Sequence, residues 1–159
     1  MHKTLAMKVL EGKRAPYEVI TYPHTMRDAA QIAVSLGLPP GQMFKTLVVP
    51  PASGQRPAKP MLVMIPADRQ LGLKKLAKLV GVKKLKMATH QEAERLTGLQ
   101  VGGISALALL NKGFAVFLDR TAETYEAVYV SAGQRGLNLK VSVGDLVQVT
   151  KARLVDVAI

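Results

Sequence analysis

The chain has 159 residues, of which 48% are hydrophobic and 21% charged, a balance that excludes a disordered chain and predicts a packed core. It contains no cysteine, which excludes disulfides, zinc-thiolate sites and a cysteine nucleophile. Lys and Arg number 22 against 11 Asp and Glu, and this net charge of +11 favours a polyanionic partner such as RNA or DNA, although a merely basic protein fits it too.

The N-terminal part of the chain predicts two helices separated by one strand. Apolar residues with helical spacing predict a helix that starts near Leu5, and a β-rich segment predicts a strand over Tyr17–Tyr22. An apolar stripe predicts a second helix over Arg27–Leu36, which Gly37 ends. Residues 1–14 lack the apolar segment of a secretion signal, and no run is long enough to cross a membrane, so we expect a cytoplasmic protein.

The middle of the chain predicts a β-hairpin followed by a helix. Two apolar runs, Phe44–Val49 and Met61–Pro66, flank the polar segment Pro50–Pro60, which we expect to be a long, exposed and disordered loop. Apolar periodicity predicts a helix over Leu73–Val80. The segment Lys84–Met87 is predicted to be a short strand.

The last part of the chain combines helix caps with strand-like segments. Thr89 and Glu92 have the spacing of a capping box that opens a helix ending near Gly98, and Ser142 and Asp145 have the same spacing before a short helix. Four segments have strand character: Phe114–Leu118, Ala127–Ser131, Leu137–Val141 and Arg153–Val157. Because helices and strands mix without a regular βαβ alternation, we predict one α+β domain with helices on a curved, mainly antiparallel sheet.

Six lysines within thirteen residues form the densest charge cluster of the chain. They are Lys74, Lys75, Lys78, Lys83, Lys84 and Lys86. Lysine side chains can neutralise phosphates, so the cluster is a candidate RNA-binding surface. A solvated helix face and turn would have the same composition.

Lys45 is unusual because it interrupts an apolar run. Strand alternation places it on the face opposite Phe44 and Thr46. An ammonium group in such a strand needs a path to water or an anionic or carbonyl partner. Both a surface lysine on an edge strand and a lysine that lines a pocket fit this pattern.

Two glycine-containing loops are candidates for close contact with a ligand. Gly102 and Gly103 lie in a Gly-Gly-Ile-Ser segment predicted to join a helix to a strand, and Ser131–Gly136 lies between two predicted strands. Glycine permits positive φ and the close approach of backbone N–H groups to a ligand. Ordinary tight turns need the same residues, so each loop can also be purely structural.

Several common catalytic motifs are absent from the sequence. Ser131 and His24 could form part of a nucleophilic triad, but no G-x-S-x-G elbow accompanies them. The three histidines do not have metal-site spacing, and neither nucleotide-binding glycine fingerprint is present. We therefore predict neither a metal site nor a nucleotide-dependent enzyme.

Four segments in register resemble the YbaK/EbsC family of Cys-tRNA(Pro) editing proteins. They are Phe44–Leu47, Gly81–Lys84, Val101–Ser105 and Tyr129–Leu137. The resemblance also includes Thr21 and Tyr22 followed by His24, and it extends over most of the chain, from near Leu10 to about Asp156. No single segment is specific for this family, but the order and spacing of all four segments together are specific for it.

The resemblance implies a single editing domain over residues 1–159, with a barrel-like mixed sheet and surrounding helices. It implies a hydrolase that removes Cys from mischarged tRNA(Pro). Prolyl-tRNA synthetase rejects cysteine poorly, because cysteine is nearly isosteric with proline and fits the same pocket. It further implies no metal or organic cofactor, and aminoacyl-tRNA and prolyl-tRNA synthetase as partners.

By the same resemblance Lys45 is the catalytic residue, which binds the terminal adenosine or the ester and stabilises charge during cleavage. The residues that the resemblance places in substrate binding are Tyr22, Phe44, Thr46, Gly102, Gly103, Ile104, Ser131, Gly133, Arg135 and Gly136. No protein nucleophile is assigned. A positioned water molecule, or the substrate's own hydroxyl or thiol, is expected to attack the ester.

Three departures from the usual family pattern bear on the substrate. Ala106 stands where proline commonly follows the Gly-Gly-Ile-Ser segment, Ala132 and Gln134 replace the more usual Gly and Lys, and Asn138 occupies a position that is often acidic. Deacylation of another small amino acid, alanine, is therefore the second expectation. Two further functions fit the sequence: a non-catalytic basic module that binds RNA 3′ ends or a synthetase, and a serine hydrolase acting through Ser131 or Ser105.

Overall fold

Strand β3 (Met61–Pro66) is buried along its whole length, and the fold is arranged around it. The computed structural model describes residues 2–52 and 59–159 of the chain. Alternate residues of β3 belong to two different cores: Leu62 and Met64 to one, Met61, Val63 and Ile65 to the other. Because both faces of the strand are covered, it has the continuous apolar sequence of a central strand.

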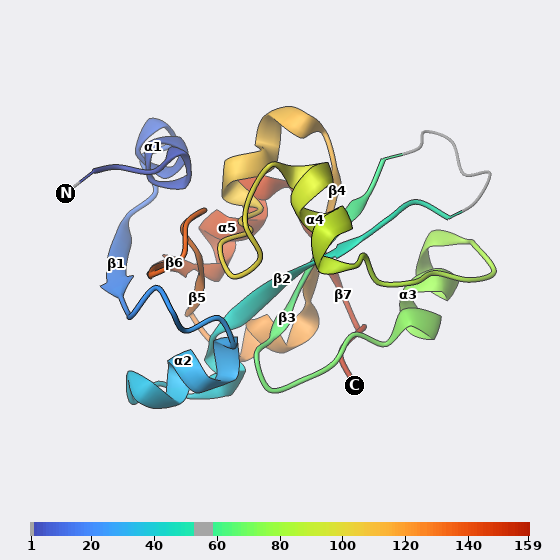
Figure 1. Cartoon of the computed structure of the whole chain (residues 1–159), viewed down its shortest axis with the longest axis horizontal. Coiled ribbons are helices and arrows are strands. Elements are labelled where there is room, and N and C mark those ends of the chain that lie inside the picture. Colours follow the sequence, from blue (N-terminus) through green and yellow to red (C-terminus); the bar gives the residue numbers. More distant parts are fainter. Residues whose placement is uncertain (1, 53–58) are drawn as a thin grey trace.

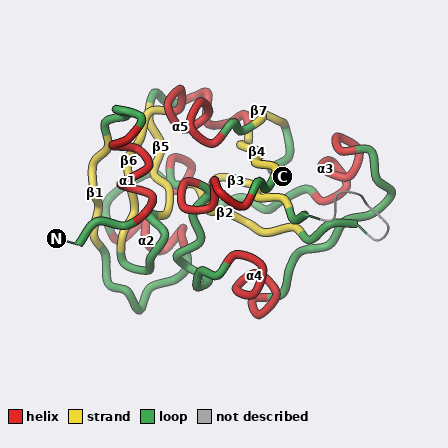
Figure 2. Tube along the Cα trace, turned by 90° about the horizontal axis from the view of Figure 1, so that it is seen from above, coloured by secondary structure: helices red, strands yellow, loops and turns green. Residues whose placement is uncertain are grey.

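Two sheets contain the strands (Figures 1 and 2). The first has the order β2-β3-β4-β7, in which β2 is antiparallel to β3 and the other two pairs are parallel. Its other strands are β2 (Phe44–Val49), β4 (Ala115–Asp119) and β7 (Arg153–Val155). The second sheet is antiparallel, with the order β1 (Tyr17–Thr21), β6 (Leu137–Ser142) and β5 (Ala127–Ser131). A bridge between Met43 and Tyr129 links the sheets.

Helices surround both sheets, as predicted for an α+β fold. The α-helices are α1 (Leu5–Gly12), α2 (Ala29–Ser35), α3 (Leu73–Val80), α4 (His90–Thr97) and α5 (Val143–Thr150). Short 3₁₀ helices are η1 (Pro40–Gln42), η2 (Leu107–Lys112) and η3 (Arg120–Thr124). The mixed, mainly antiparallel class is confirmed. In the described part of the chain, no helix has both the length and the apolar character needed to cross a bilayer.

The two predicted capping boxes differ in the structure. At α4 both bonds form: Thr89 Oγ1 accepts from Glu92 N at 3.1 Å, and Glu92 Oε1 accepts from Thr89 N at 3.0 Å. At α5, Ser142 Oγ accepts from Asp145 N at 3.1 Å. The second bond of a capping box, from Ser142 N to the Asp145 carboxylate, does not form within the described residues. Aspartate is one methylene shorter than glutamate, so the second box is only half made.

Other predictions are corrected by the structure. Lys84–Met87 forms no strand: it is an irregular connection between α3 and α4, held to β2 by one bond from Ala88 N to Val48 O at 3.1 Å. The Gly102–Gly103 segment leads into η2 and not directly into a strand. Strand β7 ends at Val155 and does not extend to residue 157.

The predicted disorder of the hairpin loop concerns mainly residues 53–58, which lie outside the described part of the chain. The two strands of that hairpin are confirmed, and they pair from Phe44 with Pro66 to Val49 with Met61.

Candidate active site

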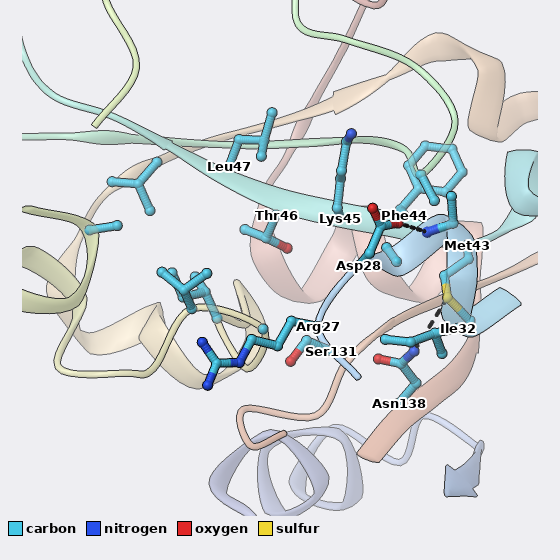
Figure 3. Close-up of a pocket in the computed structure, with 18 of the residues that line it drawn as sticks. Arg27, Asp28, Ile32, Met43, Phe44, Lys45, Thr46, Leu47, Ser131 and Asn138 are labelled. Atoms are coloured by element: carbon cyan, nitrogen blue, oxygen red, sulfur yellow. Dashed lines mark hydrogen bonds between the residues drawn. The ribbon is translucent and has the colours of Figure 1, made fainter. Parts of the chain in front are cut away.

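A pocket of about 620 Å³ opens along β2, which is the edge strand of its sheet. Five parts of the chain form its walls: β2 itself, the start of α2, the segment after β3, the connection into α4, and residues Val101, Gly102 and Ile104 (Figure 3). Ser131 and Asn138 of the second sheet, and Tyr22 directly after β1, also line it. Residues of both sheets therefore line the pocket, which lies beside the bridge between Met43 and Tyr129, since Met43 is itself a lining residue.

Strand β2 supplies two polar side chains to this pocket, on opposite sides of the strand. Lys45 extends to one side and Thr46 to the other, where Arg27 and Ser131 also lie (Figure 3). Both side chains line the pocket, because the pocket follows an edge strand that is open to both faces. Within the described residues, Lys45 takes part in no ion pair or hydrogen bond.

The hydroxyl of Thr46 is a buried polar group of the pocket wall whose hydrogen-bonding capacity is not used within the described residues. Its Oγ1 atom is buried and, among the described residues, has no hydrogen-bond partner. A buried polar atom without a partner costs about 1–3 kcal/mol, so native proteins rarely keep one without a reason. A polar ligand group or a water molecule in the pocket would satisfy this hydroxyl.

The two glycine loops predicted separately meet behind the pocket wall. Arg135 Nε donates to Val101 O at 2.7 Å. A Cβ atom on Gly103 would lie 2.9 Å from Arg135 N and 3.0 Å from the Gln134 backbone, so only glycine permits this approach. Gly102 lines the pocket and Gly103 supports it from behind.

Some of the remaining residues that were predicted to bind substrate line the pocket, and the others lie outside its lining. Tyr22, Phe44, Ile104 and Ser131 line the pocket, whereas Gly133, Arg135 and Gly136 are not among the lining residues. Gly136 packs against the backbone of Tyr22 and has φ +91°, and Gly133 has φ +94°.

Tyr22 is a protonated donor at neutral pH. Burial raises the pKa of its hydroxyl above the usual value, against the smaller opposing effects of a Gly136 backbone hydrogen bond and the Arg135 charge. The side chain is 8% exposed, which is why desolvation of the phenolate outweighs the other effects.

The arrangement around Ser131 does not resemble a nucleophilic triad. Ser131 Oγ accepts from Gly133 N at 3.1 Å, and no histidine of the described residues bonds to it. His24 lies beside Gly136 and does not line the pocket. In residues 2–52 and 59–159, no group of three or more His, Cys, Asp or Glu side chains could hold a metal ion.

Four charged residues of the pocket wall were not predicted from the sequence: Arg27, Asp28, Asp68 and Arg69. Asp28 had a local signal, because it caps α2, with Oδ1 accepting from Ala30 N at 2.9 Å and Gln31 N at 3.2 Å. Asp68 and Arg69 had none, since they simply follow a buried strand. Other unpredicted lining residues are Gln70, Met87, His90 and Asn138, of which Asn138 donates to Met43 Sδ at 3.5 Å.

The six clustered lysines are all exposed, on α3 and on the connection that leads to the pocket. Lys75 forms an ion pair with Asp156 at 3.2 Å. Lys86 directly precedes Met87, which lines the pocket. The predicted RNA-binding surface is therefore continuous in sequence with one pocket wall.

Comparison with known proteins assigns the chain and its fold to a class of protein. The model of the aminoacyl-tRNA editing domain matches residues 24–149. The crystal structure of a hypothetical protein matches with a TM-score of 0.86 and 26% identity, covering 98% of this chain and 99% of that one. That of a proposed trans-editing enzyme for prolyl-tRNA synthetase matches with a TM-score of 0.79 and 25% identity, covering 96% and 94%.

Curated relatives agree with this class. The proposed Cys-tRNA(Pro)/Cys-tRNA(Cys) deacylase EbsC of Enterococcus faecalis is 33% identical over 157 residues, 98% of this chain and 93% of that protein. The proline–tRNA ligase of Geobacter metallireducens is 28% identical over 114 residues, 72% of this chain but 19% of the ligase. The class is that of a hydrolytic deacylase. The chain belongs to the aminoacyl-tRNA editing domain family, which confirms the resemblance to the YbaK/EbsC proteins.

Proposed function

We propose that this chain deacylates Cys-tRNA(Pro) and so protects translation from cysteine at proline codons. The names of the Enterococcus relative and of the prolyl-tRNA synthetase trans-editing neighbour support this substrate. The pocket volume of about 620 Å³ is within the usual range of small-ligand sites and suits a terminal nucleoside that carries a small amino acid.

The proposal is carried by two polar groups on β2 that have no partner among the described residues, the Lys45 ammonium and the buried Thr46 hydroxyl. An ester under attack develops negative charge on its carbonyl oxygen, and preorganised donors lower the energy of that state. Lys45 supplies this positive charge from one side of β2 (Figure 3). Thr46, on the other side of the strand, supplies a hydroxyl that holds a different part of the substrate. Arg27, which extends beside Ser131, adds a second cation for a backbone phosphate (Figure 3).

The attacking group in this proposal is a water molecule or the substrate's own hydroxyl or thiol. A water molecule that bonds to the ester carbonyl carbon gives up a proton, while the ribose oxygen leaves and takes one, so that free amino acid and tRNA result. Attack by the substrate's own hydroxyl or thiol gives a migrated ester or a cyclic thioester, which water then cleaves in the same way. The pocket contributes orientation and electrostatic stabilisation. Ser131 is not used as a nucleophile, because no histidine of the described residues bonds to its hydroxyl to take the proton.

The proposal includes the biological setting. Residues 1–159 act as one editing domain, and the pairing of β1 near the start of the chain with β6 near its end supports this. Prolyl-tRNA synthetase supplies the selection of tRNA(Pro). The activity takes place in the cytoplasm, where translation uses aminoacyl-tRNA.

Release of labelled amino acid from Cys-tRNA(Pro), Ala-tRNA(Pro) and Pro-tRNA(Pro) tests the substrate. Rapid loss of cysteine with slow loss of proline is the expected result. Faster loss of alanine than of cysteine would support deacylation but would mean that Ala-tRNA(Pro), and not Cys-tRNA(Pro), is the preferred substrate. Loss of none of the three, with RNA still bound, would contradict deacylation and favour a binding module.

We also propose that the lysine cluster binds the RNA backbone, chiefly through the lysines next to the pocket. Replacing Lys84 and Lys86 together with alanine should weaken tRNA binding and make it less dependent on salt. The slope of log affinity against log salt should fall by about 0.7–0.9 for each phosphate that the variant no longer neutralises. Filter binding between about 50 and 200 mM salt, a range over which phosphate neutralisation has large effects, measures it.

The matched control removes two lysines at the opposite end of the molecule. Lys3 and Lys8 lie at or near α1, far from α3 (Figure 1). The variant in which both are alanine has the same net charge as the first, so it corrects for non-specific attraction. An equal change of slope in both variants would contradict a local RNA-binding surface.

A further inference from the structure

Two charged side chains hold Val101, one at each of its two peptide groups. Glu94 Oε2, on α4, accepts from Val101 N at 2.9 Å. Arg135 Nε, on the loop between β5 and β6, donates to Val101 O at 2.7 Å. Two elements that are far apart in sequence thus fix the residue that precedes the pocket-lining Gly102.

The turn that contains Val101 is also fixed internally. Gly103 N donates to Gln100 O at 2.8 Å, and Gly102 has φ +92°. A positive φ at the third of four residues is the signature of a type II turn, which requires glycine there. In a trans peptide the C=O and N–H bonds point in opposite directions. Since Arg135 binds the Val101 carbonyl, the Gly102 N–H points away from Arg135.

The Gly102 N–H has no acceptor among the described residues, although its residue lines the pocket. Backbone N–H groups fixed in this way stabilise the oxyanion in acyl transfer. We infer that Glu94 and Arg135 form a clamp on Val101 that aims the Gly102 N–H at the ester carbonyl of the substrate. Glu94 is then a positioning residue. This inference rests on the proposed deacylase function.

Arg135 has a different role in this inference from the one that the family resemblance suggests. Its Nε is already used for the Val101 carbonyl, and Arg135 is not among the residues that line the pocket. Its guanidinium supports the turn from the far side, while Glu94 holds the same residue from α4. Loss of Arg135 should free the Val101–Gly102 peptide directly, and loss of Glu94 should free Val101 through the peptide before it. Either change should misdirect the Gly102 N–H.

Deacylation kinetics of Glu94 variants test the clamp. Glu94→Ala, which removes the acceptor, should lower kcat by about tenfold or more, a smaller loss than the roughly 10²–10³-fold cost of deleting an oxyanion donor, and should leave KM nearly unchanged. Glu94→Gln keeps an acceptor oxygen and should restore most of kcat. Equal kcat in Glu94→Ala and wild type would overturn the inference.

Glu92→Ala is the matched control on the same helix. It removes the capping bond from Thr89 N but does not touch the turn. It should reduce thermal stability about as much as Glu94→Ala and leave kcat unchanged. A similar fall of kcat in both variants would mean that α4 stability, and not the clamp, is responsible.

A double-mutant cycle with Arg135→Met separates the clamp from direct substrate binding. If both side chains act only through Val101, the double variant should lose little more than the worse single variant, because their effects are not independent. Full additivity of the two losses would contradict a shared clamp.

An NMR measurement on the RNA-free protein decides the geometry without any activity. Glu94→Ala and Arg135→Met should shift the Gly102 amide resonance and speed exchange of the Val101 amide, and Glu92→Ala should do neither. An unmoved Gly102 resonance in Glu94→Ala would overturn the clamp. If the wild type deacylated no tRNA, the proposed function would be wrong. The spectra could then still show that Glu94 and Arg135 fix Val101, but this clamp would have no catalytic purpose.

Discussion

Replacing Lys45 by alanine should slow deacylation by about 100-fold or more, the usual cost of removing a group that stabilises the developing oxyanion. Lys45 lines the pocket and has no ion pair or hydrogen bond within the described residues, so its charge is available to the substrate. The same absence of partners means that its loss should leave stability nearly unchanged. Single-turnover cleavage of Cys-tRNA(Pro) and thermal melting measure the two effects.

Two further variants at this position separate charge from shape. Lys45→Met keeps the apolar length of the side chain and should be as inactive as Lys45→Ala. Lys45→Arg keeps the positive charge but spreads it over a planar group, so partial activity is expected. Wild-type activity in Lys45→Met would remove the charge of Lys45 from the mechanism.

The sequence predicted β2 well because one local rule governs it. Alternation of side chains puts Lys45 and Thr46 on opposite faces, and the structure agrees (Figure 3). The rule could not say that both faces would border one pocket. Both faces border the pocket because β2 is an edge strand. It is an edge strand because β4, which lies much later in the sequence, pairs with the other side of β3.

The charged wall of the pocket was not predictable for a related reason. Arg27 lies in one segment and Asp68 and Arg69 lie in another, and the two segments are far apart in the sequence and share no motif. Pairing of β2 with β3 and packing of α2 bring them together. Only tertiary structure contains this information, whereas a helix cap such as Asp28 is encoded within four residues.

Arg135 illustrates the limit of reading function from residue type. A guanidinium in a glycine-rich loop suits a ligand carboxylate or phosphate, and the same group equally suits a backbone carbonyl. The 2.7 Å bond to Val101 O and the close contact of Gly103 with the loop decide between these uses. Neither is visible in the spacing of the two motifs, which are about thirty residues apart in the chain.

Removing the carboxylate of Asp119 should destabilise the fold by about 3–5 kcal/mol, because hydrogen bonds to a charged acceptor are strong and orphaned buried donors are costly. Asp119 is 2% exposed. One oxygen accepts from Val157 N at 3.0 Å and Ala158 N at 2.8 Å. The other accepts from Thr121 N at 3.1 Å and Thr121 Oγ1 at 2.6 Å. Denaturant unfolding of Asp119→Ala at pH 7 measures the loss.

The stability that Asp119 contributes should depend on pH. Burial acts to raise the pKa of its carboxyl, but the hydrogen bonds from Thr121, Val157 and Ala158 together leave the pKa below its usual value. A carboxylate with a lowered folded pKa stabilises the protein above its unfolded pKa of about 3.9. That contribution is lost as the pH falls below this value and through the folded pKa. The stability gap between wild type and Asp119→Asn should therefore be largest near pH 7 and shrink below about pH 4.

The effect of Asp119 should extend to the pocket through the end of the chain. Gly72 N donates to Val157 O at 2.7 Å, and Ile159 N donates to Gln70 O at 2.8 Å. Gln70 lines the pocket, so loosening of residues 157–159 should free one wall and raise KM for the aminoacyl-tRNA. Asp119→Asn keeps one acceptor oxygen and should have the smaller change in both quantities. A KM that stayed constant while stability fell would mean that this wall is held independently of Asp119.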